Sequence, residues 1–130
     1  MITLDLPWPP SVNTYYRSPR SGRLAGRTLI SEAGRNYRKA VEDYVRLKRL
    51  GVTLRGSLAI RIMAFPPDRR TRDLDNCLKA LLDSITHAKA VEDDGLFDKI
   101  TIERGPVMKG GLVRVCIDRY EPPRVAGGLL

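Results

Sequence analysis

The sequence has very few of the residues that several common catalytic and structural sites require. Among its 130 residues there is one histidine, His87, and there are two widely separated cysteines, Cys77 and Cys116. Two cysteines are too few for a disulfide scaffold, and the spacing of these residues does not suit a zinc site. We expect His87, near the end of a helix, to be a surface or capping residue rather than a catalytic base.

Other absences narrow the function further. Aromatic residues make up 6% of the chain, which leaves little material for stacking nucleic-acid bases and argues against an RNA-associated protein. The sequence has no glycine-rich phosphate loop, no basic-then-apolar start typical of a signal peptide, and no apolar run of about 20 residues. We therefore expect a cytoplasmic protein with no membrane partner and no small-molecule cofactor.

The charge is strongly positive but unevenly distributed. The formal net charge is +8, with ten basic and three acidic residues in 17–49 but five basic and eight acidic residues in 66–98. A basic chain indicates an acidic partner such as nucleic acid. Because a simple DNA binder gains nothing from an acidic island, the pattern favours a nucleic-acid enzyme with a metal site; the alternative is a basic surface that only promotes solubility.

The hydrophobic pattern predicts one small α+β (α/β-type) domain over residues 1–120, followed by a flexible tail at 121–130. Alternating or apolar runs predict strands at 2–6, 57–65, 99–104 and 112–118. We expect a mixed sheet of about four strands with two main helices on it. Residues 57–104 are expected to form a right-handed βαβ crossover, and the loop after its first strand would lie at a sheet edge that suits a ligand site.

Both helices are predicted from apolar residues at spacings of three and four. A helix over 75–88 has the stripe Leu74, Cys77, Leu78, Leu81, Leu82, Ile85 and Ala88. A helix over about 32–49, capped by Ser31, is expected to bury Tyr37, Ala40, Val41, Tyr44 and Val45. The proline-rich segment 7–13 is interpreted as a fixed loop whose Trp8 covers the end of the core, and 18–27 as a mobile basic loop.

The stretch from Pro66 to Lys79 contains the candidate active site. Arg69, Arg70 and Arg72 precede two aspartates, Asp73 and Asp75, and Lys79 follows one helical turn later. A second acidic cluster, Glu92-Asp93-Asp94, follows the predicted helix. Arginine suits phosphate because its donors form a planar fork, and clustered carboxylates suit a hard ion such as Mg²⁺. Metal-assisted hydrolysis of a phosphodiester is therefore indicated.

Two simpler interpretations of this stretch stay open at this point. Asp73 can be only the N-cap of the helix. Asp75 and Lys79, four residues apart, can form only a solvated ion pair that contributes about 0.3–0.5 kcal/mol.

Candidate DNA contacts lie mostly in the basic segments. The predicted set is Asn13, Tyr16, Arg17, Arg20, Arg23, Arg27, Arg69, Arg70, Arg72 and Lys109. A further row on the 32–49 helix consists of Arg35, Arg38, Glu42, Arg46 and Arg49. This row suits a phosphate backbone, but such rows are more often simply solvated.

These motifs together resemble one known family. Leu6-Pro7-Trp8-Pro9-Pro10-Ser11-Val12-Asn13, then Arg69 to Asn76, Lys79 and Glu92-Asp93-Asp94 are similar to the RusA family of Holliday-junction resolvases from bacteria and their prophages. The sequence departs from the family at Gly95-Leu96-Phe97, where polar residues are more usual, and 18–27 falls in a variable loop.

The resemblance implies a homodimer that depends on Mg²⁺, with Mn²⁺ as a substitute, and nicks two opposed strands of a four-way DNA junction. It implies that Asp73, Asp75 and Asp94 bind the metal and that Lys79 is also catalytic. It also implies a cellular setting at the bacterial nucleoid or a phage origin. The alternative from another class is a junction-binding protein without catalytic activity.

Overall fold

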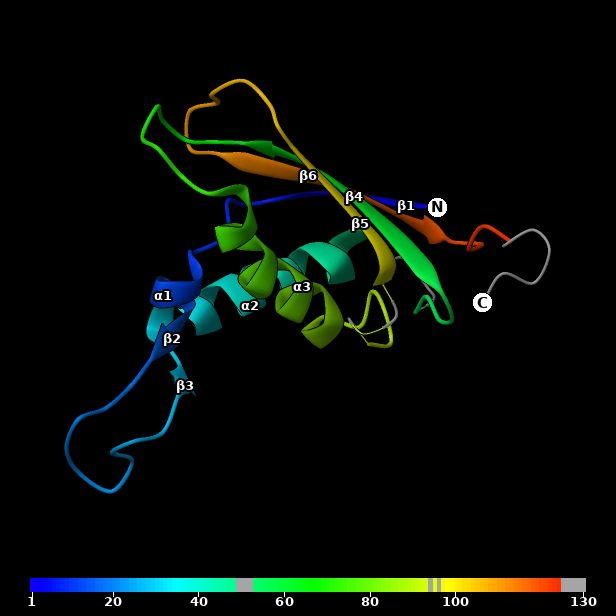
Figure 1. Ribbon diagram of the computed structural model, residues 1–130. Helices are drawn as coiled ribbons and strands as arrows, with labels where there is room; N and C mark the ends of the chain where they lie inside the picture. The colour runs from blue at the N-terminus through cyan, green and yellow to red at the C-terminus, as the bar shows by residue number, and fades with distance from the viewer. Residues whose placement is uncertain (49–52, 94, 96, 125–130) are drawn as a thin grey trace.

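The computed structural model describes residues 1–48, 53–93, 95 and 97–124. Its main sheet has the strand order β1-β6-β4-β5, as Figure 1 shows. The strands are β1 (Ile2–Leu6), β4 (Leu58–Phe65), β5 (Phe97–Arg104) and β6 (Leu112–Arg119). β6 pairs antiparallel with β1 and β4, whereas β4 and β5 are parallel. The predicted four-stranded mixed sheet is confirmed.

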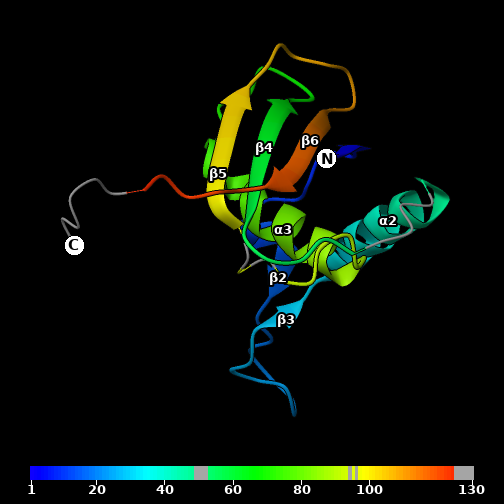
Figure 2. The ribbon, with the colours of Figure 1, turned by 90° about the vertical axis from the view of Figure 1, so that its right-hand side faces the viewer.

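The helices α2 (Glu32–Lys48) and α3 (Leu78–His87) lie on one face of this sheet, as both ribbon views show (Figures 1 and 2). Alternate strand residues point into the layer between helices and sheet, and the buried set includes Leu58, Ile60, Ile62, Ala64, Val113, Val115 and Ile117. The opposite face of the sheet has no described helix over it. The alternation that predicted β4 and β6 therefore corresponds to one buried face, and the molecule has two layers.

The predicted crossover is also present, because α3 connects the parallel strands β4 and β5. The stripe in its sequence is buried at Cys77, Leu81 and Ile85. The first turn of the expected helix is instead a 3₁₀-helix, η1 (Leu74–Cys77), which leads directly into α3. The loop 66–73 therefore leaves the carboxyl end of β4 and delivers the candidate aspartates to the start of the helix.

Helix α2 begins as predicted, with Ser31 Oγ accepting a hydrogen bond of 3.0 Å from the Gly34 amide. Tyr37, Val41 and Val45 are buried, but Ala40 is exposed, so its predicted burial is wrong. The buried stripe is narrow and begins at Gly34, where an added Cβ would lie 2.6 Å from the Tyr15 carbonyl oxygen. Because α2 packs closely against Tyr15 at Gly34, the face of α2 that contains Ala40 is turned toward solvent.

The segment before α2 contains structure that the sequence did not predict. A short helix, α1 (Val12–Tyr15), begins inside the predicted 7–13 loop and is capped by Ser11. Two short strands, β2 (Tyr16–Arg17) and β3 (Leu29–Ile30), pair antiparallel. We call residues 16–30 the basic arm; it projects from the body of the molecule (Figure 1).

Residues 121–124 of the predicted tail contain neither helix nor strand, and 125–130 lie outside the described residues. In the part of the chain that is described, no helix is long and apolar enough to span a membrane.

Candidate functional site

The two candidate aspartates lie where β4 has ended and α3 begins. Asp73 and Asp75 are both exposed. Asp73 occupies the N-cap position of η1 in extended backbone, but its side chain makes no capping hydrogen bond. The interpretation of Asp73 as only a side-chain cap is therefore not supported.

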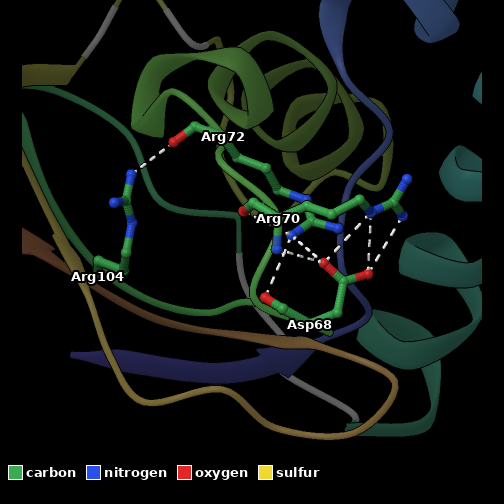
Figure 3. A network of polar contacts seen from close by, with 4 residues as sticks. All are labelled: Asp68, Arg70, Arg72 and Arg104. Carbon is green, nitrogen blue, oxygen red and sulfur yellow. Dashed lines mark hydrogen bonds and ion pairs between the residues drawn. The ribbon is translucent and has the colours of Figure 1, made fainter.

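The arginine-rich loop is organised around Asp68, as Figure 3 shows. Asp68 Oδ1 lies 2.7 Å from Arg72 Nη1 and accepts a 2.9 Å hydrogen bond from the Arg70 amide. The Arg72 and Arg70 contacts hold the pKa of Asp68 well below its usual range. Arg104 on β5 donates a hydrogen bond to the Arg72 carbonyl oxygen. These contacts fix the loop that precedes Asp73.

The three arginines of this loop have different surroundings. The Arg72 side chain is only 23% exposed, and its guanidinium lies 5.9 Å from the centre of the Trp8 ring. Arg70 is 80% exposed even though it contacts Asp68, and Arg69 is exposed as well. Arg69 and Arg70 are therefore accessible to a phosphate, whereas Arg72 mainly holds the loop together.

Two adjoining hollows of about 280 and 300 Å³ lie beside Asp73, and Asp75 is not among the residues that line either one. The residues that border both hollows are Trp8, Arg70, Arg72, Asp73 and Cys77. Trp8 packs against the core, as expected, and it also forms a wall of this site. Trp8 and Arg104 are site-lining residues that sequence reasoning missed; the proline-rich motif around Trp8 was the available signal.

Lys79 is on the first turn of α3. Its Nζ lies 3.3 Å from Asp83 Oδ1, one turn further along the helix. The simpler alternative for this stretch paired Lys79 with Asp75, four residues earlier. Asp75 is exposed, whereas the Asp83 side chain is more buried.

Glu92 and Asp93, the described residues of the second acidic cluster, lie beyond the other end of α3. The Ala90 amide donates to the Ile85 carbonyl, and the Glu92 amide donates to Leu54, which precedes β4. Ten residues of α-helix span about 15 Å, so Glu92 and Asp93 are separated from η1 by roughly that length. Asp94 itself lies outside the described residues. Among those that are described, no three His, Cys, Asp or Glu side chains form a metal-binding group.

The donor chemistry at Asp73 and Asp75 nevertheless suits Mg²⁺. In proteins this ion is often held by one or two carboxylates and keeps several of its waters. Two exposed carboxylates separated by one residue at a helix start match that pattern.

The predicted DNA contacts fall into two regions of the surface. Arg17, Arg20, Arg23 and Arg27 are exposed along the basic arm, and Asn13 is exposed on the neighbouring α1. Tyr16 is half-buried and packs edge-on against Tyr15. Lys109 is exposed in the β5–β6 loop, whose Met108 amide bonds the Pro66 carbonyl, so it shares a sheet edge with the arginine-rich loop.

The arginine row on α2 is occupied by contacts within the protein. Arg35 donates to the Ile30 carbonyl at 3.0 Å, Arg38 to the Tyr15 hydroxyl at 2.8 Å, and Arg46 to Asp43 at 2.7 Å. Arg49 lies outside the described residues. The contacts support a structural role for this row rather than a track for phosphates.

Comparison with known proteins gives consistent matches over nearly the whole chain. The model of the family described as Endodeoxyribonuclease RusA matches residues 7–118. A protein named crossover junction endodeoxyribonuclease rusA from Enterobacteria phage HK97 is 43% identical over 116 residues, covering 89% of this chain and 92% of the phage protein. The RusA protein of Escherichia coli K12 is 40% identical over 115 residues, covering 88% and 92% of the two chains.

Proposed function

The chain belongs to the RusA family of endodeoxyribonucleases, and from this membership we propose that it resolves four-way DNA junctions by metal-assisted hydrolysis of phosphodiester bonds. The observation that carries the proposal is the pair Asp73 and Asp75. Both carboxylates are exposed at the start of α3, and the Asp73 side chain makes no capping hydrogen bond. An arginine-rich loop with exposed Arg69 and Arg70 precedes them, which supports a phosphate-containing substrate.

Each residue of this site has a proposed task. Asp73 and Asp75 hold Mg²⁺, and Mn²⁺ is expected to substitute because it prefers the same oxygen ligands. When bound, the ion supplies Lewis-acid chemistry and favours ionisation of water. Lys79 stabilises the negative charge that develops on the phosphate. Arg69 and Arg70 bind the DNA backbone phosphates that flank it. Arg72 acts in DNA binding mainly by holding this loop in shape.

The DNA extends beyond the site along two basic regions. The arginines of the basic arm, together with Asn13 and Tyr16, contact one part of the junction, and Lys109 contacts the strand near the arginine-rich loop. The exposure of the arm arginines, Asn13 and Lys109 on projecting or edge segments supports this assignment, since backbone contacts need accessible donors.

We further propose that the active unit is a two-fold homodimer, since paired, symmetric cuts in opposed strands need two equivalent sites. The positions of Glu92 and Asp93 raise the question of whether one subunit supplies every ligand of a site. Glu92 and Asp93 lie about one length of α3 from η1, whereas ligands of one Mg²⁺ lie within about 2.1 Å of it. Asp94 is the third proposed metal-binding carboxylate, and in a two-fold dimer either subunit could supply it to a given site.

The basic test is cleavage of a labelled four-way junction with Mg²⁺, with EDTA as the control and a linear duplex of the same sequence as the competing substrate. We expect paired nicks only in the junction and only with the metal. A non-catalytic junction-binding protein would bind equally well with and without Mg²⁺ and leave every strand intact.

Subunit mixing tests whether the two subunits share each site. Asp75→Asn and Asp94→Asn homodimers are each expected to be inactive. If each site takes Asp75 from one subunit and Asp94 from its partner, a mixed dimer has one intact site and one doubly mutated site. Mixing should therefore restore nicking of one strand. Sites confined to single subunits would each keep one mutation, and mixing would restore nothing.

A further inference from the structure

One charged side chain on α3 is more buried than a solvated surface residue would be. The Asp83 side chain is 17% exposed, and it pairs with the Lys79 ammonium at 3.3 Å, which is itself 49% exposed. The comparable pair on α2, Lys39 and Asp43, has side chains that are 63% and 39% exposed. Asp83 is therefore set into the surface while its partner extends outward.

The Lys79–Asp83 pair is not well arranged to stabilise the helix. A lysine four residues before an acid is the less favourable order on a helix surface. Asp83 also lies in the second half of α3, where the helix dipole does not favour a negative charge. Partial burial of its carboxylate adds a desolvation cost. We therefore expect the Lys79–Asp83 ion pair to add little to the free energy of unfolding, and a role other than helix stabilisation is considered next.

Helix α1, which packs against α3, is held in place by several contacts. Tyr15 of α1 is fully buried, its hydroxyl accepts a 2.8 Å hydrogen bond from Arg38, and its carbonyl accepts one from the Ser31 amide. Burial raises the pKa of the Tyr15 hydroxyl, the Arg38 contact opposes this, and the nearby charge of Asp83 raises it further. Helix α3, which carries Asp83, thus packs against a segment that is itself held in place at the base of the basic arm.

We propose that Asp83 is a positioning residue that holds the Lys79 ammonium beside the phosphodiester being cleaved. The proposal rests on the proposed catalytic function of Lys79. A lysine side chain has many conformers, and an anchored carboxylate reduces them to those near Asp83. Because misplacement of a catalytic group by about 1 Å can cost a hundredfold in rate, such an anchor matters most in the transition state.

Asp83 is not placed to be another ligand of the same ion. It follows Asp75 by two helical turns, which corresponds to roughly 12 Å along the axis. Its effect on the reaction is therefore exerted through Lys79.

The test compares Asp83→Asn with Asp83→Glu in single-turnover cleavage of a saturating four-way junction at fixed Mg²⁺. Asp83→Asn is nearly isosteric but uncharged, and we expect its rate to fall about tenfold or more, with junction affinity and melting temperature close to wild type. Asp83→Glu keeps the charge and should recover part of the rate. Asp43→Asn, which removes the matched carboxylate on α2, should leave the rate unchanged. An Asp83→Asn rate within about twofold of wild type would overturn the proposal.

A double-mutant cycle separates positioning from a structural role. If Asp83 acts through Lys79, adding Asp83→Asn to Lys79→Ala should change the rate by less than about twofold. A full multiplicative loss in the double variant would contradict positioning. If Lys79→Ala alone cuts normally, the proposed catalytic lysine fails; if Lys79→Ala is slow but Asp83→Asn is normal, only the positioning role fails.

Discussion

Removal of three arginines from the basic arm tests whether this segment binds the DNA backbone. Arg20, Arg23 and Arg27 are exposed on the connection between β2 and β3, outside the buried core. Replacing all three with alanine should therefore leave the melting temperature nearly unchanged. If each guanidinium neutralises one phosphate of a junction, the substitution instead removes three electrostatic contacts.

The expected effect can be calculated from counterion release. Each neutralised phosphate contributes a slope of about −0.9 to log K against log salt, so three contacts contribute about −2.7. Between about 50 and 200 mM salt, the wild-type protein should then lose roughly 40-fold more affinity than the triple variant.

The assay is fluorescence anisotropy with a labelled four-way junction, with EDTA present so that no strand is cut, over a salt series. The matched control replaces Arg61, Lys99 and Arg114 with glutamine, and both variants lower the net charge from +8 to +5. Arg61, Lys99 and Arg114 lie on β4, β5 and β6, not on the arm. An unchanged slope in the arm variant, or equal flattening in both, would refute a specific role for the arm.

Three further substitutions test the packing around the site. Gly34→Ala should destabilise the fold by about 1–3 kcal/mol in urea unfolding, because the new Cβ would meet Tyr15 and Ile30 at 2.6–2.7 Å; stability at or above wild type would contradict this packing. Asp68→Asn should flatten the acid dependence of stability. The pKa of Asp68 is lowered in the fold, so its contribution is present above its ordinary pKa of about 4 and is lost as pH falls below that value. Urea titrations with the same pH profile in both proteins would contradict the Arg72 pairing. Ser84→Ala should raise stability by roughly 1 kcal/mol, because the buried Ser84 hydroxyl has no hydrogen-bond partner among the described residues; a loss of stability would show that the hydroxyl is satisfied.

The strands and the two main helices were predictable because each has a strong local pattern. The alternation of Leu58, Ile60 and Ile62 identifies the inner face of β4, and the spacing of Cys77, Leu81 and Ile85 identifies that of α3. Together with the order of strand, helix and strand, these patterns also placed the aspartates after β4 at a sheet edge. Such elements are determined by residues close in sequence, so one chain suffices to find them.

What the sequence did not predict depends on contacts between distant segments. The pairing of β2 with β3 joins residues on either side of a long irregular loop, and two-residue strands leave no periodic signal. The exposure of Ala40 follows from the close approach of α2 to Tyr15 at Gly34. Arg72 is partly buried and Arg69 and Arg70 are exposed because Arg72 contacts Trp8 and Asp68. Trp8 is far from this loop in sequence, so only the fold brings it there.

The most direct test of the whole account is single-turnover cleavage of a four-way junction by Asp75→Asn, with junction binding measured in the same samples. We predict that cleavage is lost while binding is retained or slightly strengthened, since the substitution weakens metal binding and removes a negative charge near the DNA. Asp118→Asn, which removes an exposed carboxylate on β6, is the matched control and should cut at the wild-type rate. An Asp75→Asn protein that cuts as fast as wild type would contradict the proposed site.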